Sequence, residues 1–177
     1  MNLLGIDALD EGNKTKYDFQ VQVKSDTLAV RSIMDMIVDH GDHIYSIYDF
    51  KAGRKFAELI NSTLFNQFAR QRSIDITSNN QDLARIQIML EAILVRINDP
   101  QARFYDLAAL WLPDADALRR PGSLFHVGNV QDYLMLIKDT LYNHPEYKDK
   151  IRTLENLDPG LFNYRNYTSI SPKVREL

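Results

Sequence analysis

The chain has no cysteine among its 177 residues. Disulfide bonds, thiolate metal sites and a cysteine nucleophile are therefore excluded, whereas the redox state of its compartment stays open. Glycine is also scarce, with seven residues. None of them belongs to a phosphate-binding loop, a dinucleotide-binding loop or a serine nucleophile elbow. The sequence thus lacks the short motifs that identify the common nucleotide-binding enzymes and serine hydrolases.

Long apolar runs are missing as well. No window approaches the roughly 18 apolar residues that a membrane-spanning helix requires. The segment from Met1 to Leu9 contains Asp7 and no basic side chain, so it does not resemble a signal peptide. The net charge of −3 gives no overall attraction to nucleic acid or anionic lipid. We therefore expect a cytoplasmic protein with no cofactor and no membrane contact.

What the chain does contain is a 45% share of apolar residues, enough to bury one core. We expect a single mainly helical domain at residues 17–157, preceded by an N-terminal arm at residues 1–16. Residues 158–177 are rich in Tyr, Asn, Ser and Arg without a regular period, and we expect an extended C-terminal tail there. Arms of this kind are typically ordered by a partner.

The spacing of apolar residues predicts the secondary structure. Alternation with polar residues predicts a strand at residues 17–23. A helical stripe predicts a helix that ends at Gly41, and a loop at residues 42–50 is expected to follow. The stripe consists of Val30, Ile33, Met34 and Ile37.

Further segments with helical spacing dominate the rest of the chain. Residues 102–112 are ambiguous between strand and helix, and residues 124–127 fit a short strand. The expected fold is therefore mainly α with a minor β element (α+β), a helical domain with extended N- and C-terminal arms. The further helices are expected at residues 51–72, 79–98, 130–141 and 145–157.

A dense group of potential metal ligands is formed by Asp39, His40, Asp42 and His43. Carboxylates and imidazoles this close can bind a divalent metal, as a metal-dependent hydrolase would require. The same residues are typical of a helix end and its loop, because histidine there interacts favourably with the helix dipole. All-helical metal phosphohydrolases use His-Asp, whereas both pairs here have the order Asp-His. We expect no metal site and no enzyme, with the hydrolase kept as an alternative.

Aromatic and arginine residues in the predicted loop and tail favour protein–protein contact. Such residues are enriched at interfaces and need no catalytic partner to act there. The expected contact residues are Tyr45, Tyr48, Phe162, Tyr164, Arg165 and Tyr167. A nucleic-acid-binding accessory protein is an alternative, since bases can stack on the tyrosines beside Arg165. These side chains dock equally well into protein grooves, and we do not expect nucleic acid as a partner.

The order of the elements carries a resemblance at residues 17–99. The features involved are the strand at 19–21, Asp26, the predicted helix around Ile33, Tyr48-Asp49-Phe50, Leu64-Phe65 and the helix at 79–98. This order resembles the small baseplate wedge component of contractile phage tails, which also occurs in type VI secretion baseplates. The family continues with Glu-Pro-Arg, whereas Asp99-Pro100 here is followed by Arg103 two residues late.

The resemblance implies an α+β architecture, many copies per particle and a role in linking baseplate to sheath. We therefore predict a structural subunit of a multiprotein assembly, specifically a phage-type tail or baseplate component. It would oligomerise, contact other subunits and be located in the virion after assembly in the host cytoplasm. A head–tail connector or neck adaptor of a tailed phage is an alternative, because such proteins have a similar size and a long C-terminal arm.

Overall fold

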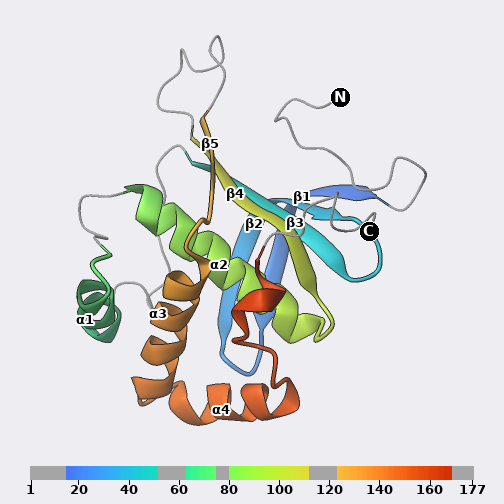
Figure 1. Cartoon of the computed structure of the whole chain (residues 1–177). Helices are drawn as coiled ribbons and strands as arrows, with labels where there is room; N and C mark the ends of the chain where they lie inside the picture. The colour runs from blue at the N-terminus through green and yellow to red at the C-terminus, as the bar shows by residue number, and fades with distance from the viewer. Residues whose placement is uncertain (1–14, 52–62, 75–79, 112–122, 169–177) are drawn as a thin grey trace.

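A five-stranded mixed β-sheet forms the centre of the computed structural model, which describes residues 15–51, 63–74, 80–111 and 123–168. Its strands lie in the order β1-β2-β3-β4-β5 (Figure 1). β1, β2 and β3 form an antiparallel meander, β4 runs parallel to β3, and β5 is antiparallel to β4. The strands are β1 Lys16–Ser25, β2 Val30–Asp39, β3 Ile44–Lys51, β4 Arg103–Trp111 and β5 Ser123–His126.

The α-helices of the described part of the chain lie on one side of this sheet (Figure 1). α2 packs against β1, β3 and β4, α3 packs against α1 and α2, and α4 packs against α3. Parallel strands need a long crossover connection, and α1 and α2 lie within the one between β3 and β4. The helices are α1 Thr63–Gln71, α2 Asn80–Asn98, α3 Val130–Asn143 and α4 Lys148–Leu157, followed by the 3-10 helix η2 Tyr164–Asn166.

The most deeply buried helix is α2, which lies between the sheet and α3. Every residue from Ile86 to Arg96 is buried. The helix predicted at residues 79–98 is therefore confirmed, and it contacts both the sheet and α3. The strand predicted at residues 17–23 is also confirmed, as part of β1.

The helix predicted to end at Gly41 is wrong, because its residues form β2. Ile33, a member of the supposed stripe, is 47% exposed, whereas Met36 and Val38 outside the stripe are at most 3% exposed. β2 is a central strand with apolar residues on both faces. A strand buried on both faces contains apolar residues at nearly every spacing, so a helical stripe arises by coincidence.

Two further segments that were not predicted as strands are also strands. The loop expected at residues 42–50 is mostly β3, and the ambiguous residues 102–112 are mostly β4. The strand expected at residues 124–127 is β5. A mainly α fold with a minor β element is therefore wrong. The fold is α+β with a central five-stranded sheet.

The start of the predicted C-terminal tail packs into the domain. Asp158 receives hydrogen bonds from buried Arg96, at 2.7 Å from Nε and 2.9 Å from Nη2. Tyr167 is 1% exposed and stacks on Phe104 of β4 with ring centroids 5.4 Å apart. Residues 158–168 thus belong to the packed domain rather than to an extended tail. The helix predicted at residues 51–72 is described only as α1.

Other predictions lie outside the described residues. The N-terminal arm at residues 1–16 is described only at Thr15 and at Lys16, which begins β1. Residues 169–177 of the tail also fall outside the described ranges.

Candidate functional site

One side of the β1–β2 hairpin faces away from the helices. Ser32 Oγ donates to Glu91 Oε1 of α2 at 2.9 Å, and Met34 belongs to the main core. Ile33 lies between them and must point the opposite way, because side chains alternate along a strand. We call this side of the sheet, opposite α2, the outer face.

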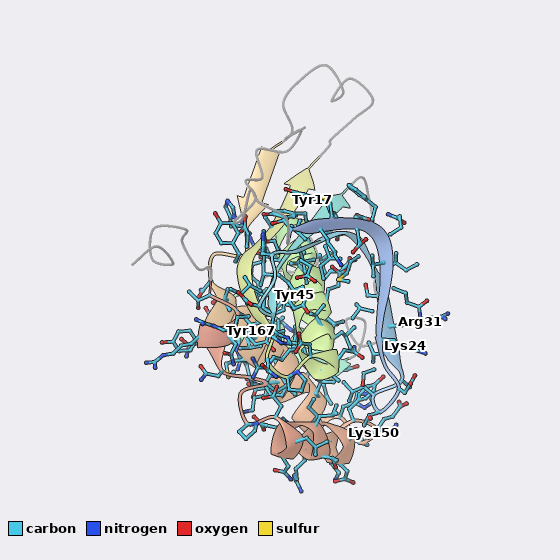
Figure 2. All side chains as sticks on the ribbon, turned by 90° about the vertical axis from the view of Figure 1, so that its right-hand side faces the viewer. Tyr17, Lys24, Arg31, Tyr45, Lys150 and Tyr167 are labelled. Atoms are coloured by element: carbon cyan, nitrogen blue, oxygen red, sulfur yellow. The ribbon has the colours of Figure 1, made fainter. Side chains whose placement is uncertain are left out.

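β1 bends at Gln20, whose φ of +53° is rare for residues other than glycine. Before the bend Phe19 pairs with Met36, which lies outside the main core, whereas after it Val21 pairs with Met34 of the main core. The side chains of β1 therefore change sides at Gln20, and those of β2 change sides opposite it, between Met34 and Met36. Figure 2 shows the resulting curve in the ribbon of β1 between its two ends.

Three large apolar side chains are exposed on the outer face of the hairpin. Tyr17 is 45%, Phe19 61% and Ile33 47% exposed. Single exposed apolar residues are common, but a group on one surface with polar residues around it marks an interaction site. We call these three residues the hairpin patch.

The hairpin patch borders a small buried cluster on the same face. Phe19 pairs with Met36, and Tyr17 pairs with Val38. The cluster is separate from the main core and consists of Met36, Val38, Tyr48 and Ala108. The patch is therefore the exposed margin of a group of apolar side chains whose other members are buried.

Two cations lie toward the turn of the same hairpin. Lys24 is directly opposite Arg31 in the register of β1 and β2 (Figure 2). Like charges opposite each other in a sheet repel. Lys24 Nζ is 3.5 Å from the exposed Asp26, whereas Arg31 makes no ion pair with any residue in the described ranges. The outer face thus combines apolar and basic side chains.

A chain of hydrogen bonds crosses the outer face farther along the sheet. His40 Nε2 lies 2.8 Å from Ser46 Oγ, and Ser46 in turn hydrogen-bonds Tyr48. Tyr48 Oη donates to Asp106 Oδ2 at 3.0 Å, and Asp106 Oδ1 lies 2.7 Å from His126 Nδ1. Burial and the charge of Asp106 raise the pKa of Tyr48, so its hydroxyl remains a donor. The His126 side chain at the end of this hydrogen-bond chain is 58% exposed.

The carboxylate of Asp99 connects the β2–β3 turn to the segment between α2 and β4. Asp99 Oδ2 lies 2.7 Å from His43 Nδ1 and accepts from Tyr45 Oη at 2.8 Å. Burial alone would raise the pKa of Asp99, but these two hydrogen bonds and one from the Gln101 backbone hold it below its usual value. The β2–β3 turn is therefore fastened to the segment between α2 and β4.

This arrangement predicts a specific sensitivity to acid. Because the folded-state pKa of Asp99 is depressed, its contribution is present above the unfolded pKa and lost as the pH falls through the folded value. An Asp99→Asn variant should be less stable than wild type near neutrality and lose less stability below about pH 4. Urea midpoints at both pH values, with Asp26→Asn as an exposed control, measure this. Equal acid losses in wild type and Asp99→Asn would contradict it.

The four potential metal ligands of the hydrolase alternative lie at the tight turn between β2 and β3. His40 is buried and bonded to Ser46, whereas His43 is bonded to Asp99. Asp39 Oδ1 accepts from the Gly41 backbone, and Asp42 is exposed with a positive φ of 55°. No group of three or more potential metal ligands occurs in the described part of the chain. The geometry therefore offers the hydrolase alternative no assembled site.

The six predicted contact residues differ in exposure and fall into three groups. Tyr48, Phe162 and Tyr167 are at most 5% exposed. Phe162 and Tyr167 belong to the main core, whereas Tyr48 lies in the small buried cluster on the outer face. Tyr45 is partly buried and held by Asp99. The exposed members are Tyr164, which is 41% exposed, and Arg165, whose guanidinium lies 6.0 Å from the Tyr164 ring. Only these two present much surface to a partner.

The features that sequence reasoning missed are the hairpin patch and the hydrogen-bond chain. Tyr17 and Phe19 alternate with polar residues, but alternation does not show which face is exposed. Asp106 and His126 lie 20 residues apart and meet only because β4 pairs with β5. No local sequence signal joins them.

None of the helices in the described part of the chain is long and apolar enough to cross a membrane. No protein-family model, curated protein or solved structure matches this chain.

Proposed function

We propose that this protein is a structural subunit of a multiprotein assembly and that the hairpin patch is one of its contact surfaces. The observation that carries the proposal is the exposure of Tyr17, Phe19 and Ile33 on one face of two paired strands. Fully burying such a side chain contributes roughly 1.5–3 kcal/mol. About half of that gain is still available at each of the three, which is enough to support a specific contact.

Further exposed apolar and aromatic side chains lie on the helical side of the sheet. Leu157, at the end of α4, is 77% exposed and Tyr164 is 41% exposed. Arg165 adds a cation beside that ring. The predicted contact residues Tyr164 and Arg165 therefore remain candidates. A subunit with contact surfaces on both sides of its sheet can join two different neighbours, as rings and stacked assemblies require.

The specific particle we propose is a phage-type tail or baseplate, with a head–tail neck adaptor as the alternative and the virion as the location. Support comes from the resemblance in element order at residues 17–99. The strand at 19–21 and the helix at 79–98 are present, whereas the helix expected around Ile33 is β2. The proposal of an assembly subunit does not depend on this identification.

Charge placed in the hairpin patch should remove the contact without unfolding the protein. Phe19→Glu and Ile33→Glu introduce carboxylates that an apolar interface would have to desolvate, at a cost of about 2 kcal/mol or more. Expressed in the native host, either variant should lose its co-purifying subunits while its thermal unfolding stays near that of wild type.

The matched control is Leu157→Gln, which alters an exposed apolar residue on the helical side. It should retain any partner bound through the hairpin. If Phe19→Glu and Ile33→Glu both keep the full set of co-purifying subunits, the hairpin patch is not a contact surface.

A further inference from the structure

The hairpin patch continues into a basic surface that the described residues neutralise only in part, through Asp26 beside Lys24. Lys24 and Arg31 are cross-strand neighbours on the outer face, next to the pair formed by Gln22 and Ile33. Because opposed like charges cost stability, an anionic group placed against both side chains would relieve that repulsion. Asp26, at 3.5 Å from Lys24, is 88% exposed and partners only one of the two cations.

We propose that the partner on this surface is an acidic protein segment with an apolar part. Its apolar side chains cover Phe19 and Ile33, and its carboxylates lie against Lys24 and Arg31. Arginine suits this role because its planar guanidinium binds a carboxylate through two parallel hydrogen bonds. This inference rests on the proposed function and adds the chemistry of the partner.

The shape of β1 favours contact through side chains over strand pairing with a second copy. An edge strand can pair with another chain along a straight row of backbone groups, and a bend removes that row. β1 bends at Gln20, in the middle of its ten residues (Figure 2). If a second copy paired with β1 edge to edge, its backbone could align with only about half of the strand.

Nucleic acid fits this surface less well. Aromatic side chains beside cations can stack on bases, but Ile33 offers no ring, and the chain carries a net charge of −3. Single-stranded nucleic acid also needs a longer basic track than two side chains. An acidic protein segment can bind through as few as two cations, such as Lys24 and Arg31.

A titration followed by NMR tests the proposal with defined probes. The full chain, labelled with ¹⁵N, is titrated with a short synthetic peptide that has a valine-rich half and a glutamate-rich half. The second probe carries lysine in place of glutamate, and the third is single-stranded oligothymidylate. Only the glutamate peptide should shift the amides of Phe19, Ile33 and Arg31, with an affinity that falls as salt is added.

Two charge-reversal variants test whether binding depends on the charge of this surface. Arg31→Glu should weaken binding of the glutamate peptide about tenfold, as expected when an attraction becomes a repulsion. Lys150→Glu, a charge reversal on α4 (Figure 2), should leave it unchanged. The inference is overturned if the lysine peptide or oligothymidylate shifts the same amides, or if no probe shifts them. If Phe19→Glu still loses native partners in that case, the proposed function stands and only the partner chemistry is wrong.

Discussion

Replacing Asp158 by alanine should destabilise the protein by roughly 3–5 kcal/mol, because it leaves the buried guanidinium of Arg96 without its counter-charge. Arg96 is 7% exposed and donates to both carboxylate oxygens of Asp158. Its third bond, from Nη1 to the Ala102 carbonyl at 2.7 Å, cannot neutralise the charge. For a chain of this size the melting temperature should fall by on the order of 10 °C.

The surroundings of this ion pair leave little room for relaxation. A side chain at Gly160 would place its Cβ 2.7 Å from Arg96 Nη2 and 2.9 Å from Asn166 Nδ2. The control is Asp26→Ala, which removes a carboxylate from an exposed pair and should cost less than about 1 kcal/mol. Differential scanning calorimetry measures both variants. Similar melting temperatures for the two would show that the Arg96–Asp158 pair does not hold the C-terminal segment.

Replacing Tyr167 by alanine should cost about 3–5 kcal/mol, through the lost apolar contacts and the cavity left behind. Tyr167 is 1% exposed, stacks on Phe104 and donates from its hydroxyl to the Leu161 carbonyl at 2.6 Å. Burial raises the pKa of Tyr167, so the hydroxyl stays neutral and the loss does not depend on pH near neutrality.

Tyr167→Phe separates the ring from its hydroxyl. This variant keeps the stack on Phe104 and loses only one hydrogen bond, so it should cost about 1 kcal/mol. Urea denaturation of the two variants gives the comparison. If Tyr167→Ala is no more destabilising than Tyr167→Phe, the ring contributes little and residues 158–168 are not part of the core. Deletion of all residues after Leu157 should be more damaging than either.

The helices of this fold can be predicted from sequence, but its sheet is predicted only in part. α2 and α3 place apolar residues at helical spacing and lie where the spacing indicates. The second half of β2, from Met34 on, and most of β4 are buried on both faces, so their apolar residues show no period of two. Only tertiary pairing distinguishes such strands from helices. The error at β2 then led to the wrong view that the fold is mainly α.

The candidate site was predicted least well, for a related reason. Tyr17 and Phe19 form the apolar side of an alternating strand, which favoured their burial. The change of sides at Gln20 turns them outward, and a positive φ at a glutamine has no sequence signature. In the tail, Tyr167 was expected at a partner contact because nothing local shows that Phe104 stacks on it. Tyr164 and Arg165 are exposed, and their role as contact residues stays a prediction.

Site-specific photo-crosslinking at position 19 tests the central claim most directly. A photoreactive phenylalanine analogue replaces Phe19 in the full chain, expressed in the native host, and a matched protein carries it at Lys150 of α4. Irradiation should give a position-19 adduct with one other subunit, whose crosslinked peptide is rich in Asp or Glu beside apolar residues. No adduct at position 19, or the same adducts from both positions, would contradict a contact surface on the β1–β2 hairpin.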